Sequence, residues 1–98
     1  MAKKLLKGKT QSGFSFTIDP AKLYDMRFIE ALSEHEDMSD NEALLFLPKL
    51  LNMVLGAEQK EKLYHHIEKD GFVDPQKVET ELGEIFKIAS AKNEEVKN

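Results

Sequence analysis

Residues 13–32 read GFSFTIDPAKLYDMRFIEAL, and this stretch decides the fold. Apolar side chains alternate with polar ones from Phe14 to Ile18, which is the pattern of a strand with one buried face. After Asp19 and Pro20 the apolar side chains recur every three or four residues, which is the pattern of a helix. The change of period predicts a strand that leads directly into a helix.

A second strand is expected just before this stretch, at residues 5–9. Residues 10–13 between the two strands are polar and end in glycine, and such a linker suits a hairpin loop. A two-stranded hairpin is marginal in water by itself. Phe14, Phe16 and Ile18 must therefore be covered, either by the helices that follow or by a sheet in a neighbouring subunit.

Capping residues predict where the first two helices begin. Asp19 can cap a helix that has Pro20 at its first position, and Asp25 offers a second possible start. Ser39 and Glu42 form a capping box, in which each side chain accepts a hydrogen bond from the backbone of the other residue. The expected helical segments are residues 19–32 and 39–55, with an acidic loop at residues 33–38.

Two more helices are expected in the second half of the chain. Gly56 and the Asp70-Gly71 pair should end the second and third helices, because glycine readily adopts the left-handed conformation of a helix terminus. Asp74 before Pro75 repeats the combination of a cap and a proline. The expected segments are residues 57–69 and 75–91, with a brief strand as an alternative at residues 72–73.

The second helix is apolar on almost every side. Pro48 lies inside it, and the missing N–H and the bulk of the ring predict a kink or break near residues 46–48. Such a helix is buried centrally in its own chain, or is buried partly by another subunit or a partner. Both interpretations stay open. The candidate interface residues, including two from the hairpin, are Leu44, Leu47, Leu51, Met53, Leu55, Phe14 and Phe16.

These patterns predict a mainly α (α+β) fold, with an N-terminal β-hairpin followed by a bundle of about four helices. The 98 residues suffice for one domain, with the hairpin at 1–18, a helical body at 19–91 and a frayed tail at 92–98. The chain contains no cysteine. No apolar run approaches the roughly 20 residues of a membrane span. We therefore expect a cytoplasmic protein without disulfides and without a membrane partner.

The net charge of −4 is unevenly distributed. Residues 1–9 contain four lysines and no acid, whereas the remainder contains ten basic and eighteen acidic residues, a net charge of −8. This acidic body would repel the phosphates that a nucleic-acid-binding protein must neutralise. We expect no nucleic-acid partner. The basic segment is either a solvated edge strand or a contact for an acidic partner.

No group of residues predicts catalysis or metal binding. His65 and His66 are adjacent on a helix and point about 100° apart, so they do not readily share one ion. Residues 37–42 lack the oxygen spacing and the glycine of a calcium loop. Residues 7–10, KGKT, lack the first glycine of a phosphate loop, and Ser12 has no identifiable histidine partner. We expect no catalytic, metal-binding or cofactor-binding residues, and hence a binding or assembly protein rather than an enzyme.

Five short segments carry a resemblance to a known family: KTQSGF at 9–14, DMRFIEAL at 25–32, LGAEQ at 55–59, DG at 70–71 and EIF at 84–86. In this order they resemble the small tail assembly chaperones of siphovirus-type bacteriophages and prophages of Gram-positive hosts. None of the segments is a catalytic motif, and the resemblance assigns no partner-contacting residue.

The resemblance implies a mostly helical protein that acts in the host cytoplasm before the tail is complete. Such chaperones are thought to coat the tape measure protein and keep it soluble until tail tube subunits polymerise round it. The implied partners are therefore the tape measure protein and the major tail tube protein. Separately, the apolar helix at residues 44–55 and the edge of the hairpin predict binding of a partner or association between copies of the chain. A second class stays open from the residues alone, namely a small acidic regulatory adaptor or inhibitor.

Overall fold

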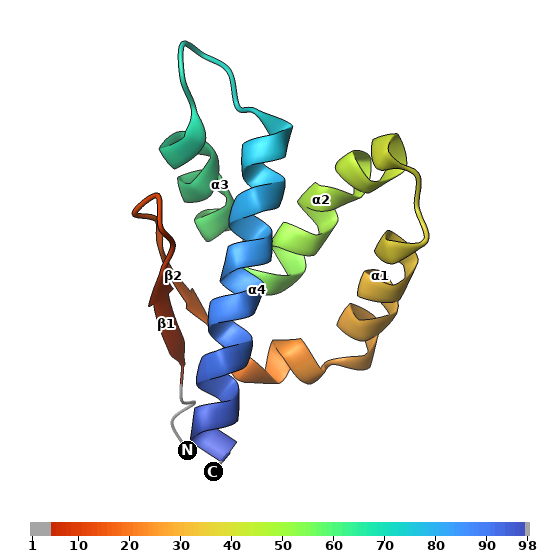
Figure 1. The fold of residues 1–98 in the computed structure, drawn as a ribbon, viewed down its shortest axis with the longest axis vertical. Helices are drawn as coiled ribbons and strands as arrows, with labels where there is room; N and C mark the ends of the chain where they lie inside the picture. The colour runs from red at the N-terminus through yellow and green to blue at the C-terminus, as the bar shows by residue number, and fades with distance from the viewer. Residues whose placement is uncertain (1–4, 98) are drawn as a thin grey trace.

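The computed structural model describes the backbone of residues 5–97 and the side chains of residues 5–91. It contains an N-terminal hairpin followed by four α-helices, so the mainly α (α+β) fold class is confirmed (Figure 1). The elements are β1 Leu6–Lys9, β2 Ser15–Ile18, the 3-10 helix η1 Pro20–Tyr24, α1 Met26–Glu36, α2 Asp40–Val54, α3 Gly56–Ile67 and α4 Pro75–Lys97. No helix in the described part of the chain is both long enough and apolar enough to cross a membrane.

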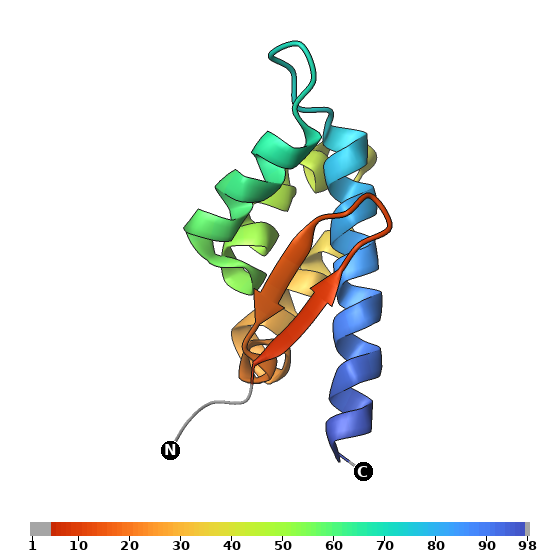
Figure 2. The same ribbon diagram turned by 90° about the vertical axis from the view of Figure 1, so that its left-hand side faces the viewer.

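The hairpin lies against the helices of its own chain. The antiparallel register pairs Leu6 with Ile18 and Gly8 with Phe16, so alternate side chains share one face. Leu6, Phe14, Phe16 and Ile18 on this face are buried. Figure 2 shows β1 beside α4, with β2 on the side of α3. The helices therefore cover the apolar face of the hairpin without a sheet from a neighbouring subunit.

Gly8 allows β1 and α4 to approach each other closely. A Cβ atom at this position would lie 2.6 Å from Cζ of Phe16 and 2.9 Å from Cγ2 of Ile88. Both distances are shorter than Cβ atoms normally adopt. The ring of Phe16 on β2 thus occupies the space that a side chain at Gly8 would need. The KGKT segment serves packing in a strand, and glycine is required there for steric reasons.

Both aspartates that were candidates for the first helix start are used. Asp19 Oδ1 accepts a hydrogen bond from the Ala21 N–H at 3.0 Å and caps η1. Asp25 Oδ1 accepts from the Arg27 N–H at 2.8 Å and caps α1. Asp25 has an extended backbone, with ψ of 128°. The single helix expected from residue 19 is therefore two helical segments separated by this residue.

The prediction of an acidic loop at residues 33–38 is wrong for residues 33–36, which are helical. α1 continues to Glu36, and the Asp37 N–H donates to the Glu34 carbonyl at 3.2 Å to close its last turn. Glutamate is a good helix former, and Glu34 and Glu36 are exposed to solvent. The acidic composition therefore describes the solvated face of a helix, and only residues 37–39 connect α1 to α2.

α2 begins with the predicted capping box. The Ser39 N–H donates to Glu42 Oε1 at 3.1 Å, and the Glu42 N–H donates to Ser39 Oγ at 3.4 Å. The helix continues through Pro48 without a break, and a kink near residues 46–48 stays a prediction. Proline costs the helix one backbone hydrogen bond. Burial of Leu47 and Leu50 on either side of it holds the two halves of α2 against the core.

A tight reversal separates α3 from α4. Asp70 and Gly71 have φ angles of 53° and 77°. Lys69 and Phe72 exchange two backbone hydrogen bonds, of 2.9 and 3.0 Å. Positive φ at both central residues is the geometry of a type I′ turn, for which Asp-Gly is a favoured sequence. The strand considered for residues 72–73 is reduced to one isolated bridge between Lys69 and Phe72.

α4 packs against the hairpin, α2 and α3. Its predicted start is present, because Asp74 Oδ1 accepts from the Gln76 N–H at 3.0 Å beside Pro75. The backbone remains helical to Lys97, beyond the helix end expected at residue 91. The side chains of the expected frayed tail, residues 92–98, lie outside the described residues, as do residues 1–4 of the expected hairpin. The largest fully buried side chains of the shared core are Ile18, Leu50, Leu51, Leu63, Ile85 and Val54.

Candidate protein-binding site

The seven candidate interface residues divide into buried and partly buried side chains. Leu44 and Met53 are partly buried and pack against the core. The other five are at most 5% exposed: Leu47, Leu51, Leu55, Phe14 and Phe16. These five side chains are covered by the chain itself, as expected for a central core helix and the inner face of a hairpin. Of the seven, Leu44 and Met53 are the side chains that a partner can reach.

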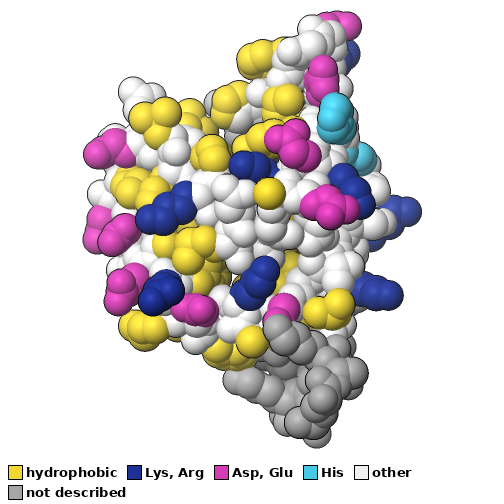
Figure 3. Space-filling model, turned by 180° about the vertical axis from the view of Figure 1, so that it is seen from behind, with side chains coloured by type: hydrophobic (Ala, Val, Ile, Leu, Met, Phe, Trp, Pro, Cys, Tyr) yellow, Lys and Arg dark blue, Asp and Glu magenta, His cyan; other side chains and the backbone are white. Residues whose placement is uncertain are grey.

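Other apolar side chains reach the surface. Leu45 is 83% exposed on α2, and Phe72 is 62% exposed in the turn before α4. Tyr24, Met26 and Ile29 form a second exposed set on η1 and α1. On the face shown in Figure 3, hydrophobic side chains form separate islands between charged ones. A partner that needs several apolar contacts would therefore be held better by a hollow than by this open surface.

A mainly apolar hollow lies where α2, α3 and the start of α4 meet. We call it the α2–α4 groove, and its volume is about 200 Å³. Its lining residues are Leu44, Leu47, Pro48, Tyr64, Val73, Pro75 and Val78. A groove of this size can receive apolar side chains but not a whole helix. A partner helix would therefore lie across the groove and insert its anchor residues.

Tyr64 gives the groove a polar group. Burial raises the pKa of Tyr64, and the nearby Glu61 carboxylate raises it further. The phenol is protonated at neutral pH, as an ordinary tyrosine is. The Nζ atom of Lys60 lies 5.9 Å from the centre of the ring, a cation–π distance. The phenol can therefore offer a hydrogen bond to a partner at the margin of an otherwise apolar groove.

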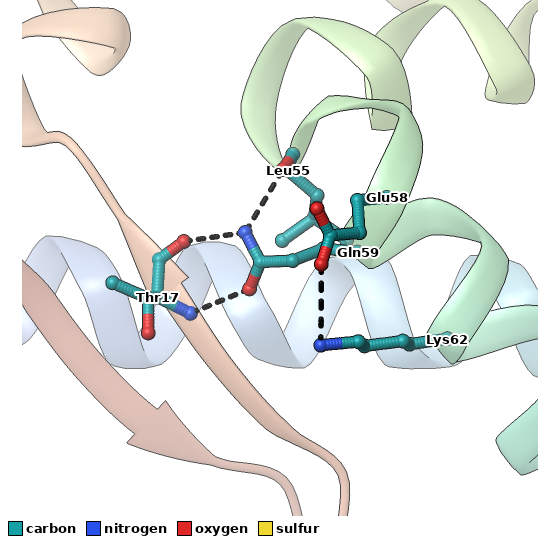
Figure 4. Close-up of polar contacts among 5 residues, drawn as sticks. All are labelled: Thr17, Leu55, Glu58, Gln59 and Lys62. Atoms are coloured by element: carbon teal, nitrogen blue, oxygen red, sulfur yellow. Dashed lines mark hydrogen bonds and ion pairs between the residues drawn. The ribbon is translucent and has the colours of Figure 1, made fainter.

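The outer edge of β2 is occupied by a side chain from α3. The Thr17 N–H donates to Gln59 Oε1 at 2.8 Å, and Gln59 Nε2 donates to the carbonyls of Thr17 at 2.7 Å and Leu55 at 2.8 Å (Figure 4). The amide of Gln59 thus occupies the position that a neighbouring strand would take. A partner strand can pair with β2 at Thr17 only if Gln59 moves away.

A polar cluster holds the hairpin loop against α3 and α4. Glu81 is only 6% exposed, and its carboxylate accepts from Thr10 Oγ1 at 2.8 Å and from Ser12 Oγ at 3.0 Å. Ser12 Oγ also lies 3.0 Å from His66 Nε2. The backbone N–H of Gln11 donates to the carboxylate of Glu84. The buried carboxyl group of Glu81 therefore has hydroxyl groups as hydrogen-bond partners, as a buried polar group requires.

This cluster brings Ser12 and His66 together, which sequence reasoning did not foresee. In a serine hydrolase the histidine lies between the serine and the carboxylate. Here Ser12 lies between the other two residues, with its Oγ atom 3.0 Å from His66 Nε2 and 3.0 Å from Glu81 Oε2. The carboxylate therefore contacts the serine instead of orienting the histidine. The arrangement positions a loop.

The three histidines have separate surroundings. His35 stacks on Phe46, with ring centres 6.2 Å apart, and lies in α1 rather than in a loop. His65 lies 3.6 Å from Glu68, and its neighbour His66 faces the hairpin loop. Among the described residues, no group of three or more histidines, cysteines or acids is placed to hold a metal ion.

The sequence did not predict most of the residues that line the groove. Helical spacing alone does not predict that Tyr64, Val73 and Val78 share a hollow, because they come from α3, a connecting segment and α4. The Asp70-Gly71 pair is the one signal that could have suggested it. A type I′ turn at this pair brings the end of α3 close to the start of α4.

Comparison of the chain with known proteins gives no significant match to a protein-family model, a curated protein or a solved structure. Its function is therefore argued from the surfaces described above, together with the resemblance carried by its short segments.

Proposed function

We propose that this protein is a bacteriophage tail assembly chaperone that binds the tape measure protein through the α2–α4 groove. The observation that carries the proposal is an accessible apolar groove on a small acidic protein. The resemblance supplies the class of partner, and the groove supplies a place where that partner can bind. The proposed setting is the host cytoplasm, before tail tube subunits enclose the tape measure protein.

The physical argument concerns solubility. A long helical protein with apolar stripes aggregates when those stripes are exposed to water. Leu44, Val73 and the two prolines of the groove can cover part of such a stripe, because helix-in-groove recognition uses apolar anchors spaced along one helix face. The negative charge of the chaperone would then keep the coated complex in solution.

A second candidate function is a regulatory adaptor that binds a basic surface of another protein. The observation that favours it is a set of exposed acids on α1, the connection to α2 and the first turn of α2. The two candidates differ in their response to salt. Binding through exposed charges is lost as ionic strength rises, whereas apolar binding in the groove persists.

Co-expression with the tape measure protein of the same phage tests the leading proposal. We expect the tape measure protein to be insoluble alone, soluble with this chain, and recovered with it in buffer containing about 0.5 M salt, where charge contacts are screened. Soluble tape measure protein without the chain, or no complex between the two, would contradict the proposal.

Variants of the groove separate binding from folding. Leu44→Asp and Val73→Asp place a charge at two partly buried groove positions, and each should abolish recovery of the tape measure protein. Ile29→Asp is the matched control, because Ile29 is a 41% exposed apolar residue on α1, outside the groove. Circular dichroism establishes that each variant is folded. Loss of binding in the Ile29 variant alone would place the site on α1 instead.

A further inference from the structure

The solvent-facing side of the hairpin forms a shallow basic hollow, which we call the hairpin hollow. Its volume is about 560 Å³, and its lining includes Lys7, Lys9, Ser15, Thr17, Gln59 and Lys62. The three lysines are exposed, and the described residues of the lining include no acid. Lys62 lies 3.6 Å from Glu58, but both side chains are largely exposed, so another carboxylate can compete for this lysine.

The strongest negative surface lies elsewhere on the molecule. We call it the acidic edge, and its exposed residues are Glu30, Glu34, Glu36, Asp37, Asp40 and Glu42. Figure 1 places α1 and the hairpin on opposite sides of the fold. Figure 3 shows acidic side chains along the margin formed by α1, with basic ones beside them, and further basic side chains at the opposite margin. The two surfaces therefore cannot meet within one molecule.

We propose that the hairpin hollow of one copy receives the acidic edge of a second copy, so that the chain associates head to tail. Charge complementarity selects this occupant, because the chain itself carries the negative surface that the basic hollow lacks. The two contacting surfaces differ from each other, so the contact is heterologous and repeats into a ring or an open chain. This inference does not depend on the tape measure protein as partner.

The strength of the contact depends on several charges acting together. A single exposed ion pair contributes little, and its attraction is screened by salt. The screening length is about 30 Å at 0.01 M salt and about 3 Å at 1 M salt. The association is therefore expected at low ionic strength and absent at high ionic strength. Apolar association through the groove would not weaken in this way.

Analytical ultracentrifugation at rising protein concentration tests the proposal, in about 0.01 M and about 1 M salt. The hollow variant combines Lys9→Glu with Lys62→Glu, and the edge variant combines Glu30→Lys with Glu34→Lys. We expect the wild type to associate at low salt and each double variant to associate about tenfold more weakly. The matched control combines Lys69→Glu with Lys77→Glu. It has the net charge of the hollow variant, but its changes lie outside the hollow, so it should associate like the wild type.

An equal mixture of the hollow and edge variants gives the decisive result. The reversed hollow of one variant is complementary to the reversed edge of the other, so the mixture should associate like the wild type. A monomeric wild type at low salt, a failed restoration, or equal weakening of the control would overturn the proposal. Binding of a poly-glutamate peptide to a monomeric wild type would likewise overturn it and assign the hollow to a different acidic partner.

Discussion

A methyl group added at Gly8 would meet Phe16 and Ile88 at 2.6 and 2.9 Å. Gly8→Ala should therefore lower the free energy of unfolding by about 1–3 kcal/mol, as overpacking of a filled core does. Urea unfolding followed by circular dichroism measures the effect. Gly83→Ala is the matched control, because a Cβ atom there meets nothing within 4 Å. This change should raise the free energy of unfolding by about 0.5–1 kcal/mol, since alanine favours the helix more than glycine does. Equal effects of the two changes would contradict the close approach of β1 and α4.

Gln59 is a second residue whose role can be isolated. Gln59→Leu leaves the N–H and C=O groups of Thr17 without their partner, which should cost about 1–3 kcal/mol of stability. Hydrogen exchange of the Thr17 amide should become faster. Lys62→Ala is the control on the same helix, because it removes only an exposed ion pair and should change stability by less than about 0.5 kcal/mol. Unchanged exchange at Thr17 in the leucine variant would show that the amide does not protect the strand edge.

At the scale of secondary-structure elements, the capping box makes α2 sensitive to pH. The Glu42 carboxylate accepts hydrogen bonds from the backbone N–H and the hydroxyl of Ser39, and these bonds lower the pKa of Glu42. The ionised carboxylate therefore stabilises the folded state above the ordinary glutamate pKa of about 4.3, and this stabilisation is lost as the pH falls through the lower folded pKa. Ser39→Ala should consequently cost more stability at neutral pH than near pH 3. Urea unfolding of both proteins at the two pH values measures this, and an equal or larger cost in acid would contradict it.

The secondary-structure elements also show which features of the fold can be predicted from the sequence. Helix starts at Asp19, Asp25 and Ser39 were predicted because each cap involves residues within three positions of one another. The end of α1 was misplaced, since exposed glutamates suit a helix face as well as a loop. The bond between Thr17 and Gln59 joins residues 42 positions apart, and no local pattern indicates it. The groove escaped prediction for the same reason, because its lining comes from separate segments.

At the scale of the whole molecule, core and surface can be distinguished by matched substitutions on α2. Leu51 is 0% exposed, whereas Leu45 is 83% exposed. Leu51→Asp should unfold the protein, because an unpaired buried carboxylate costs several kcal/mol, comparable to the whole stability of a small domain. Leu45→Asp should change stability by less than about 0.5 kcal/mol. Thermal unfolding measures both, and a normal transition in the Leu51 variant would contradict the assignment of α2 to the core.

The whole molecule thus presents three different surfaces around one core. The α2–α4 groove is apolar, the hairpin hollow is basic, and the acidic edge lies across the fold from the hairpin. Charged contacts weaken as the salt concentration rises, whereas apolar contacts persist. Binding of a partner and association between copies can therefore be studied separately in the same protein.

The most direct test of the central claim is a nuclear magnetic resonance titration of the labelled protein with a soluble fragment of the tape measure protein. At about 0.5 M salt, where charge contacts are screened, amide shifts should concentrate at residues 44–47, 64, 73 and 78, which line the groove or lie beside its lining. The amides of the hairpin hollow should stay unchanged. Absence of binding, or shifts confined to the acidic edge or the hairpin, would contradict the claim that the groove holds the tape measure protein.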